Sequence, residues 1–345
     1  MVGETFEYIA SFVVSGMVTG SLYALAAFGI VIVYRATRVL NFAHGAIGVS
    51  AAFIMLALVR AGLPVWCAFI TAVLFGGVCG ICVMYTLAPV PKHMTLSRVM
   101  ITTGWLLTLN NLMVLLFGRE SKQVPALFPT ETIRIGQVNI GFDQIGMLVT
   151  AVLVCAAGYL AIQKTGFGRS LRAVSENPGF AESLGINSGK ITAFAWAASG
   201  GTAAVSVIMA ARFMSLETEF ITGTVNFIRI AGCMMGGLFS LPMTFAGGIL
   251  IGVTQALVQI APGNLYIFRI IYHGIPFLIV FIALTRKKER HDDPGYTKQA
   301  ADLRFMVLAN VPAAGGGRFS GSGRSAGGGR TNGQRIGQKA EKKET

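Results

Sequence analysis

The chain has 345 residues, of which 53% are hydrophobic and only 12% are charged. A soluble domain usually carries about twice that share of charged residues, and the long apolar runs exclude an arrangement of two soluble domains. We therefore expect an all-α polytopic membrane protein, in which the 43 glycines allow helices to pack closely.

Nine apolar segments have the composition of membrane spans, which need about 20 residues each. The segment 225–239 is short and glycine-rich, so it is able to enter the membrane without crossing it. We predict eight or nine transmembrane helices, some of them short or broken. The predicted spans are 9–33, 42–60, 65–88, 98–117, 144–163, 191–211, 225–239, 243–262 and 267–285.

Basic residues in the connections predict the orientation, because cytoplasmic connections carry an excess of Lys and Arg. One alternate set of connections holds twelve basic residues and the other holds six. We expect the first set to be cytoplasmic, with the N-terminus outside the cell and the C-terminus inside. The first set is Arg35, Arg38, Lys92, Arg98, Lys164, Arg169, Arg172, Lys190, Arg286, Lys287, Lys288 and Arg290; the second is Arg60, Arg119, Lys122, Arg134, Arg212 and Arg269.

The longest external connection is predicted at 118–143. Within it, apolar residues alternate with polar ones from Ile133 to Ile140, and Gly136-Gln137 is typical of a turn. This pattern predicts a small β-hairpin in an extracytoplasmic loop.

The sequence becomes polar after residue 290, so we divide the chain into a transmembrane domain, 1–290, and a basic tail, 291–345. The tail is rich in glycine and we expect it to be largely disordered. Within its glycine-rich stretch Arg318, Arg324 and Arg330 recur every six residues, which resembles a nucleic-acid-binding segment, but Phe319 is the only aromatic residue of that stretch. We favour a flexible cytoplasmic tail beside anionic lipid and expect no nucleic-acid partner.

The polar segment 164–190, KTGFGRSLRAVSENPGFAESLGINSGK, separates two apolar runs and has strong helical features. Leu171 begins a first short apolar stripe. Asn177 followed by proline is typical of a helix N-cap and first position. A second stripe follows, and Gly185 is suited to end it in a left-handed conformation. We predict two short amphipathic helices, which form either a plain connection or a docking element for a soluble partner. The second stripe consists of Phe180, Ala181 and Leu184, with Glu182 on its flank.

Polar residues also stand where the chain re-enters the membrane after the first span. Asn41 and His44 precede Gly45 and Gly48, and glycine beside polar residues in an apolar segment is typical of a broken helix lining a cavity. A hydrogen bond between helices is the simpler interpretation of His44, and a position on a translocation pathway is the alternative. Asn226, followed by Phe as Asn41 is, suggests a second such segment.

Several expected sites of chemistry are missing from the sequence. There is no G-x-x-x-x-G-K-[ST] motif for ATP phosphates, no H-E-x-x-H motif and no cluster of metal ligands. The spans hold almost no Asp or Glu, which disfavours a proton-coupled carrier. We expect a chain that is not an enzyme, with no metal or cofactor of its own.

Three stretches resemble the permease subunits of branched-chain amino acid ABC transporters, of the LivH type. GSLYALAAFGIVIVYRATRVLNFAHG is similar to the first signature of that family, and GRSLRAVSENPGFAESLGIN to its cytoplasmic coupling loop. GLFSLPMTFAGGILIGVTQAL is similar to its late glycine-rich pair of spans. The likeness covers roughly residues 9–285.

The resemblance implies an importer in the bacterial inner membrane. A second, LivM-like permease, two cytosolic ATPases that bind ATP and Mg²⁺, and an extracytoplasmic binding protein would complete it. The expected cargo is a branched-chain or similar small apolar amino acid. Because Ala46 stands where the family commonly has an acidic residue, an importer of urea or short amides remains open, as does a stand-alone channel or secondary carrier. The residues implied in ATPase coupling are Leu171, Arg172, Glu176, Asn177, Phe180, Ala181, Glu182, Leu184 and Gly185.

Overall fold

The computed structural model of the chain describes residues 2–91, 94–120, 122–135, 138–212 and 240–260, together with residues 274 and 278. Its contacts divide the chain into two units, Met1–Arg290 and His291–Thr345. All described residues belong to the first unit, so the predicted tail lies outside them.

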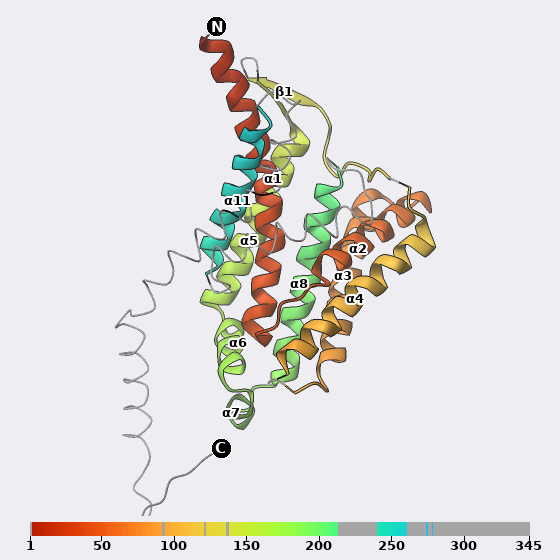
Figure 1. Cartoon of the computed structure of the whole chain (residues 1–345), viewed down its shortest axis with the longest axis vertical. Coiled ribbons are helices and arrows are strands. Elements are labelled where there is room, and N and C mark those ends of the chain that lie inside the picture. The colour runs from red at the N-terminus through yellow and green to blue at the C-terminus, as the bar shows by residue number, and fades with distance from the viewer. Residues whose placement is uncertain are drawn as a thin grey trace, which may run out of the picture. The chain divides into compact units, whose positions relative to one another are not determined.

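The described part of the chain is a helical bundle with one small hairpin (Figure 1). Helices α6 and α7 are the two short helices predicted within 164–190. The elements are α1 (Val2–Thr37), α2 (His44–Arg60), α3 (Val65–Leu87), α4 (Thr95–Phe117), β1 (Thr132–Ile135), β2 (Val138–Gly141), α5 (Phe142–Lys164), α6 (Gly166–Glu176), α7 (Pro178–Ser183), α8 (Ser188–Ala210) and α11 (Leu241–Val258).

The prediction of a polytopic helical membrane protein is confirmed. Six helices among the described residues, α1, α3, α4, α5, α8 and α11, are long and apolar enough to cross a membrane. Helix α2 is apolar but has 17 residues, or about 25 Å at 1.5 Å per residue. It is buried on all sides along its first three turns, as expected of a helix inside a bundle. The predicted spans 225–239 and 267–285 lie outside the described residues.

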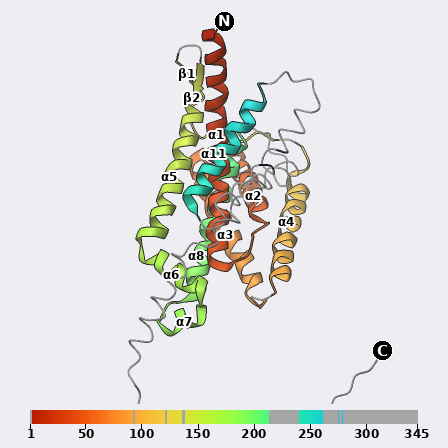
Figure 2. The same ribbon diagram turned by 60° about the vertical axis from the view of Figure 1, so that its left-hand side comes forward.

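Helices α1 and α11 pack at backbone distance and run in opposite directions. A Cβ atom added to Gly16 would lie 2.7 Å from the Cα of Val253, and one added to Gly20 would lie 2.8 Å from the Cα of Ile249. Contacts this close require glycine at these two positions. Figure 2 shows α11 lying along the upper part of α1. The sequence's small-xxx-small spacing at Gly16 and Gly20 therefore marks a real helix contact.

Helices α3 and α8 form a second close pair. A Cβ atom added to Gly76 would lie 2.6 Å from the carbonyl oxygen of Gly200, and one added to Gly80 would meet the carbonyl oxygen of Trp196. Trp196 is itself completely buried. The outer faces of α3, α4 and α5 instead expose large apolar side chains, such as Leu74 at 65%, as a lipid-facing surface does.

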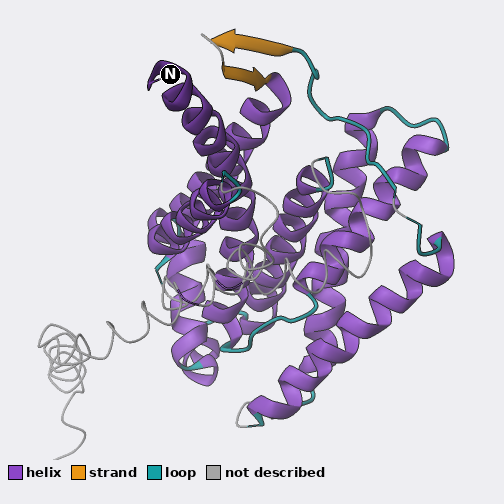
Figure 3. Cartoon of the chain, turned by 45° about the horizontal axis from the view of Figure 1, so that its top comes forward, coloured by secondary structure: helices purple, strands orange, loops and turns teal. Residues whose placement is uncertain are grey.

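The long helices from α1 to α5 alternate in direction, so their connections gather at two ends. The β-hairpin and the first turn of α5 mark one end, which we call the hairpin end, and α6 and α7 mark the other, which we call the α6–α7 end (Figures 1 and 3). The strands pair antiparallel with Ile135 opposite Val138, which confirms the predicted hairpin. The two predicted sets of basic residues, so far as they are described, lie at opposite ends.

Candidate functional site

The sequence predicted the local structure of the α6–α7 segment correctly. Asn177 is the N-cap of α7, and its side-chain Oδ1 accepts a hydrogen bond of 3.1 Å from the backbone N–H of Phe180. Pro178 occupies the first turn, where its missing N–H removes no helical hydrogen bond. These two residues set the angle between α6 and α7.

Gly185 ends α7 as predicted. Its φ is +80°, a left-handed conformation that glycine adopts without steric strain. The N–H of Ile186 donates to the carbonyl of Ala181 over 3.0 Å, and the N–H of Gly185 donates to that of Glu182 over 2.9 Å. This pair of bonds is a Schellman motif, which orders the chain beyond the helix.

Further hydrogen bonds fasten the segment to its neighbours. The Ser188 hydroxyl donates to the carbonyl of Pro178 over 3.3 Å, and Arg172 Nη1 donates to the carbonyl of Ile162 over 3.3 Å. The rings of Phe167 and Phe194 meet edge to face with centroids 4.8 Å apart. The segment is thereby attached to both α5 and α8.

Burial divides the predicted coupling residues into two groups. Leu171, Val174 and Ala181 are at most 3% exposed because they pack inside the chain, against neighbouring helices. Phe180 and Leu184 are 62% and 63% exposed. In this structure Ala181 and Leu171 therefore pack within the chain, and their roles in ATPase coupling stay predictions. The short length of α7 and its turn toward α8 place Ala181 on the inner side.

The charged coupling residues lie on the surface of the segment. Glu176 and Glu182 are exposed, as are Asn177 and Gly185. Arg172 is also exposed although its guanidinium bonds to α5. The surface around Phe180 and Leu184 thus carries both signs of charge.

His44 lies at the centre of the bundle. It is completely buried, and its Nδ1 lies 3.1 Å from the Ser199 hydroxyl of α8 in a hydrogen bond. A Cβ atom added to Gly29 of α1 would meet the side chains of both Thr202 and His44. The hydrogen bond required by the simpler interpretation of His44 is present, and a position on a pathway stays a prediction.

The chain between α1 and α2 departs from the expected helix break. The break lies before the glycines, at 38–43, and Arg38 has a φ of 57°. Helix α2 then runs without interruption through Gly45 and Gly48. The interpretation of these glycines as a break is wrong: a Cβ atom on Gly48 would meet Val207 and the carbonyl of Ala203, so Gly48 serves close packing on α8.

Helix α4 braces this turn. Arg98 Nη1 donates to the carbonyl of Thr37 over 3.4 Å, and the Thr102 hydroxyl donates to that of Leu40 over 3.3 Å. Asn41 is 2% exposed, and its Oδ1 accepts from the N–H of Ala43 over 3.1 Å. The turn that holds Asn41 is thus part of the packed interior. Asn226 lies outside the described residues.

A polar cavity of about 430 Å³ lies near the hairpin end, between α1, α5 and α11. Its volume is in the range of small-molecule sites. Three hydroxyl and three carboxamide side chains contribute to its wall, beside apolar residues, and none of the described residues that line it is charged. The lining residues are Ser11, Phe12, Ser15, Val18, Thr19, Gln144, Gly252, Gln255, Ala256 and Gln259.

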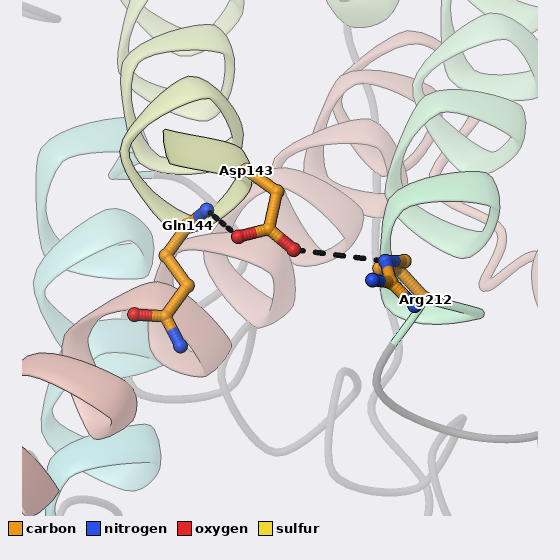
Figure 4. A network of polar contacts seen from close by, with 3 residues as sticks. All are labelled: Asp143, Gln144 and Arg212. Carbon is orange, nitrogen blue, oxygen red and sulfur yellow. Dashed lines mark hydrogen bonds and ion pairs between the residues drawn. The ribbon is translucent and has the colours of Figure 1, made fainter. Parts of the chain in front are cut away.

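An ion pair stands beside this cavity. Asp143 Oδ2 lies 3.6 Å from Arg212 Nε, and Asp143 Oδ1 accepts a hydrogen bond of 2.9 Å from the N–H of Gln144 (Figure 4). The Asp143 side chain is 13% exposed and that of Arg212 is 36% exposed. The pair joins the first turn of α5 to the end of α8.

The α1 side of the cavity carries a sequence signal of its own. Ser11, Ser15 and Thr19 lie four residues apart in succession, a spacing that places them on one face of a helix. That stripe was a usable signal. Gln255 and Gln259, which lie four residues apart, line the same cavity.

The apolar helices define a polytopic membrane protein. Comparison with protein families refines this assignment. A family model described as "Branched-chain amino acid transport system / permease component" matches residues 12–284. The chain therefore belongs to this permease family.

Individual relatives agree. The chain is 26% identical over 268 residues to the high-affinity branched-chain amino acid transport system permease protein LivH of Salmonella typhimurium, covering 74% of this chain and 87% of that protein. It is 28% identical over 271 residues to the corresponding protein BraD of Pseudomonas aeruginosa, covering 73% and 87%. A probable LivH of Methanocaldococcus jannaschii is 25% identical over 280 residues, covering 77% and 87%.

Proposed function

We propose that the chain is the permease subunit of an ATP-driven importer of branched-chain amino acids. Relatives described as high-affinity branched-chain amino acid permeases support this assignment. Its partners are a second, LivM-like permease, two cytosolic ATPases and an extracytoplasmic binding protein. The chain itself does no chemistry on the cargo.

The observation that carries the proposal is the exposure of Phe180 and Leu184 on an ordered segment. An amphipathic helix that presents apolar residues to a groove is a common mode of recognition between proteins. The caps at Asn177 and Gly185 order this segment in the free chain. The chain thus presents Phe180 and Leu184 to a partner on a segment that is already folded.

The partner must bring the nucleotide. The sequence holds no P-loop, so ATP and Mg²⁺ bind to the ATPase chains. The excess of basic residues assigns the α6–α7 end to the cytoplasm, where those ATPases are, and the N-terminus to the outside. The bacterial inner membrane is the corresponding location.

Movement of the segment reaches the bundle through its contacts. Helix α6 packs on α1, α5 and α8, and Leu171 and Val174 are buried in that junction. Closure of two ATPases would therefore tilt the attached helices as rigid bodies, the usual basis of alternating access. Asn41 and His44 lie where α1, α2 and α8 meet, so we assign them to the border of the translocation pathway.

A reconstitution experiment tests the proposal. The tagged chain is purified from its native host, and the proteins that accompany it are identified. We expect a P-loop ATPase among them, and ATP-dependent accumulation of radiolabelled leucine in proteoliposomes that carry the complex and its binding protein. Accumulation without ATP would indicate a channel or secondary carrier, and accumulation of urea but not of leucine would indicate the alternative cargo.

A further inference from the structure

The cavity between α1, α5 and α11 has a composition suited to a zwitterion. We propose that it receives the transported amino acid on the hairpin side of the permease, a proposal that rests on the function proposed above. Hydroxyl and carboxamide groups each supply both hydrogen-bond donors and acceptors. They can therefore bind an ammonium group and a carboxylate at the same time.

None of the described residues that line the cavity carries a formal charge, and this favours one class of ligand. A fixed charge in a cavity favours a ligand of opposite charge and leaves an unpaired charge when the site is empty. Neutral dipoles favour a ligand whose own charges sum to zero. Phe12 and Val18 belong to the same wall, and they offer an apolar surface to an aliphatic side chain.

The helices hold the two polar walls close together. Gly16 and Gly252 lie in the contact between α1 and α11, which brings Ser15 and Gln255 into the lining of one cavity. On the α5 side, the Asp143–Arg212 pair secures the first turn, and the Gln144 side chain points away from Arg212 (Figure 4). The site is therefore built from three separate helices.

The cavity is also open to solutes. Ser15 and Gln259 are exposed, whereas Gln255, one turn before Gln259, is buried at the cavity's inner side. Under the proposed orientation this opening lies near the outer face, where a binding protein releases its amino acid. Both the position of the cavity and the chemistry of its lining residues are therefore consistent with a site that receives the transported amino acid.

Thiol labelling tests the site directly. Ser15→Cys is introduced into a variant whose native cysteines are replaced, within the full transporter complex in proteoliposomes. A small water-soluble methanethiosulfonate reagent should label the introduced cysteine. Leucine at about ten times its dissociation constant for this cavity should slow the labelling about tenfold, because bound leucine then covers the cysteine most of the time. Ser21→Cys is the matched control, because Ser21 lies on the same helix but is completely buried and bonds to Val18; it should resist labelling.

Each other outcome overturns the proposal in a distinguishable way. Labelling that leucine does not slow, in a complex that accumulates leucine, would show that the cavity holds only water while the proposed function stands. Resistance of Ser15→Cys to the reagent would show that the cavity is closed to solutes. Protection by urea and not by leucine, in a complex that does not accumulate leucine, would overturn the cargo and with it the proposed zwitterion site. Protection by glutamate as strong as by leucine would overturn the role assigned to Phe12 and Val18.

Discussion

Leu184 is 63% exposed, whereas Ala181, three residues earlier in the same segment, is completely buried. Their spacing in the sequence predicts that both residues lie on one apolar stripe. In the structure Ala181 instead lies on the buried side of the segment and Leu184 on the exposed side. Mutation can therefore separate the buried position, Ala181, from the exposed one, Leu184, which we propose faces a partner.

We predict that Leu184→Asp inserts normally, loses its ATPase during purification and stops ATP-dependent uptake of leucine. Burial of a leucine contributes roughly 1.5–3 kcal/mol, and an unpaired charge in the interface adds a penalty of several kcal/mol. Retention of the ATPase should thus fall at least about tenfold. Leu63→Asp makes the same change at an exposed position at the hairpin end and should leave retention unchanged. If the Leu184 variant keeps its ATPase and its uptake, the segment is a plain connection.

We predict that Gly248→Ala destabilises the protein more than Gly104→Ala. A Cβ atom on Gly248 would lie 2.5 Å from the backbone nitrogen of Ala24, whereas one on Gly104 meets nothing within 4 Å. Overpacking typically costs about 1–3 kcal/mol, while alanine in an open helical position gains roughly 0.5–1 kcal/mol over glycine. Thermal unfolding of the two purified variants in one detergent measures the difference. Equal midpoints would contradict the close contact of α1 with α11.

We predict that His44→Ala reduces leucine uptake more than Ser199→Ala does. Both substitutions remove the 3.1 Å hydrogen bond between α2 and α8, which contributes about 0.5–1.5 kcal/mol to stability. A role at the pathway border belongs to the imidazole alone. Initial uptake rates are compared after correction for the amount of assembled complex. An equal loss in both variants would reduce His44 to a helix-packing residue.

We predict that a cysteine at Ser183 is labelled by a membrane-impermeant reagent only in inverted vesicles. Ser183 is exposed at the α6–α7 end, which the basic residues assign to the cytoplasm. A cysteine at Leu63, at the hairpin end, should be labelled in intact cells. Both variants need a background without native cysteines, since Cys67 and Cys82 are exposed. Labelling of Ser183→Cys from outside would reverse the orientation.

Local features were predictable because the sequence alone determines them. Asn177 caps α7 by accepting a hydrogen bond from the backbone N–H of Phe180, three residues later in the chain. Gly185 adopts a left-handed conformation that few other residues tolerate. The alternation from Ile133 to Ile140 likewise predicted the hairpin. In each case the interacting residues are neighbours in the chain.

Features that depend on distant neighbours were not predictable from one sequence. Ala181 is buried because α7 turns back toward α8, and Gly48 is helical because it packs on Val207. The cavity needs Ser15 and Gln255, which are far apart in the sequence, to line one space. Spacing identifies a helical face, but it does not say which other helix will cover that face.

The close contact of α1 with α11 has a consequence for biosynthesis. Helix α1 leaves the ribosome before the other described helices, but its Gly16 and Gly20 pack against Val253 and Ile249 of α11, respectively, among the last of the described residues. In the two-stage view, helices insert separately and then associate. During synthesis the glycine face of α1 therefore stays without its native partner until α11 has entered the membrane. Completion of the α1–α11 pair, and of the cavity that it walls, is a late step in the assembly of this permease.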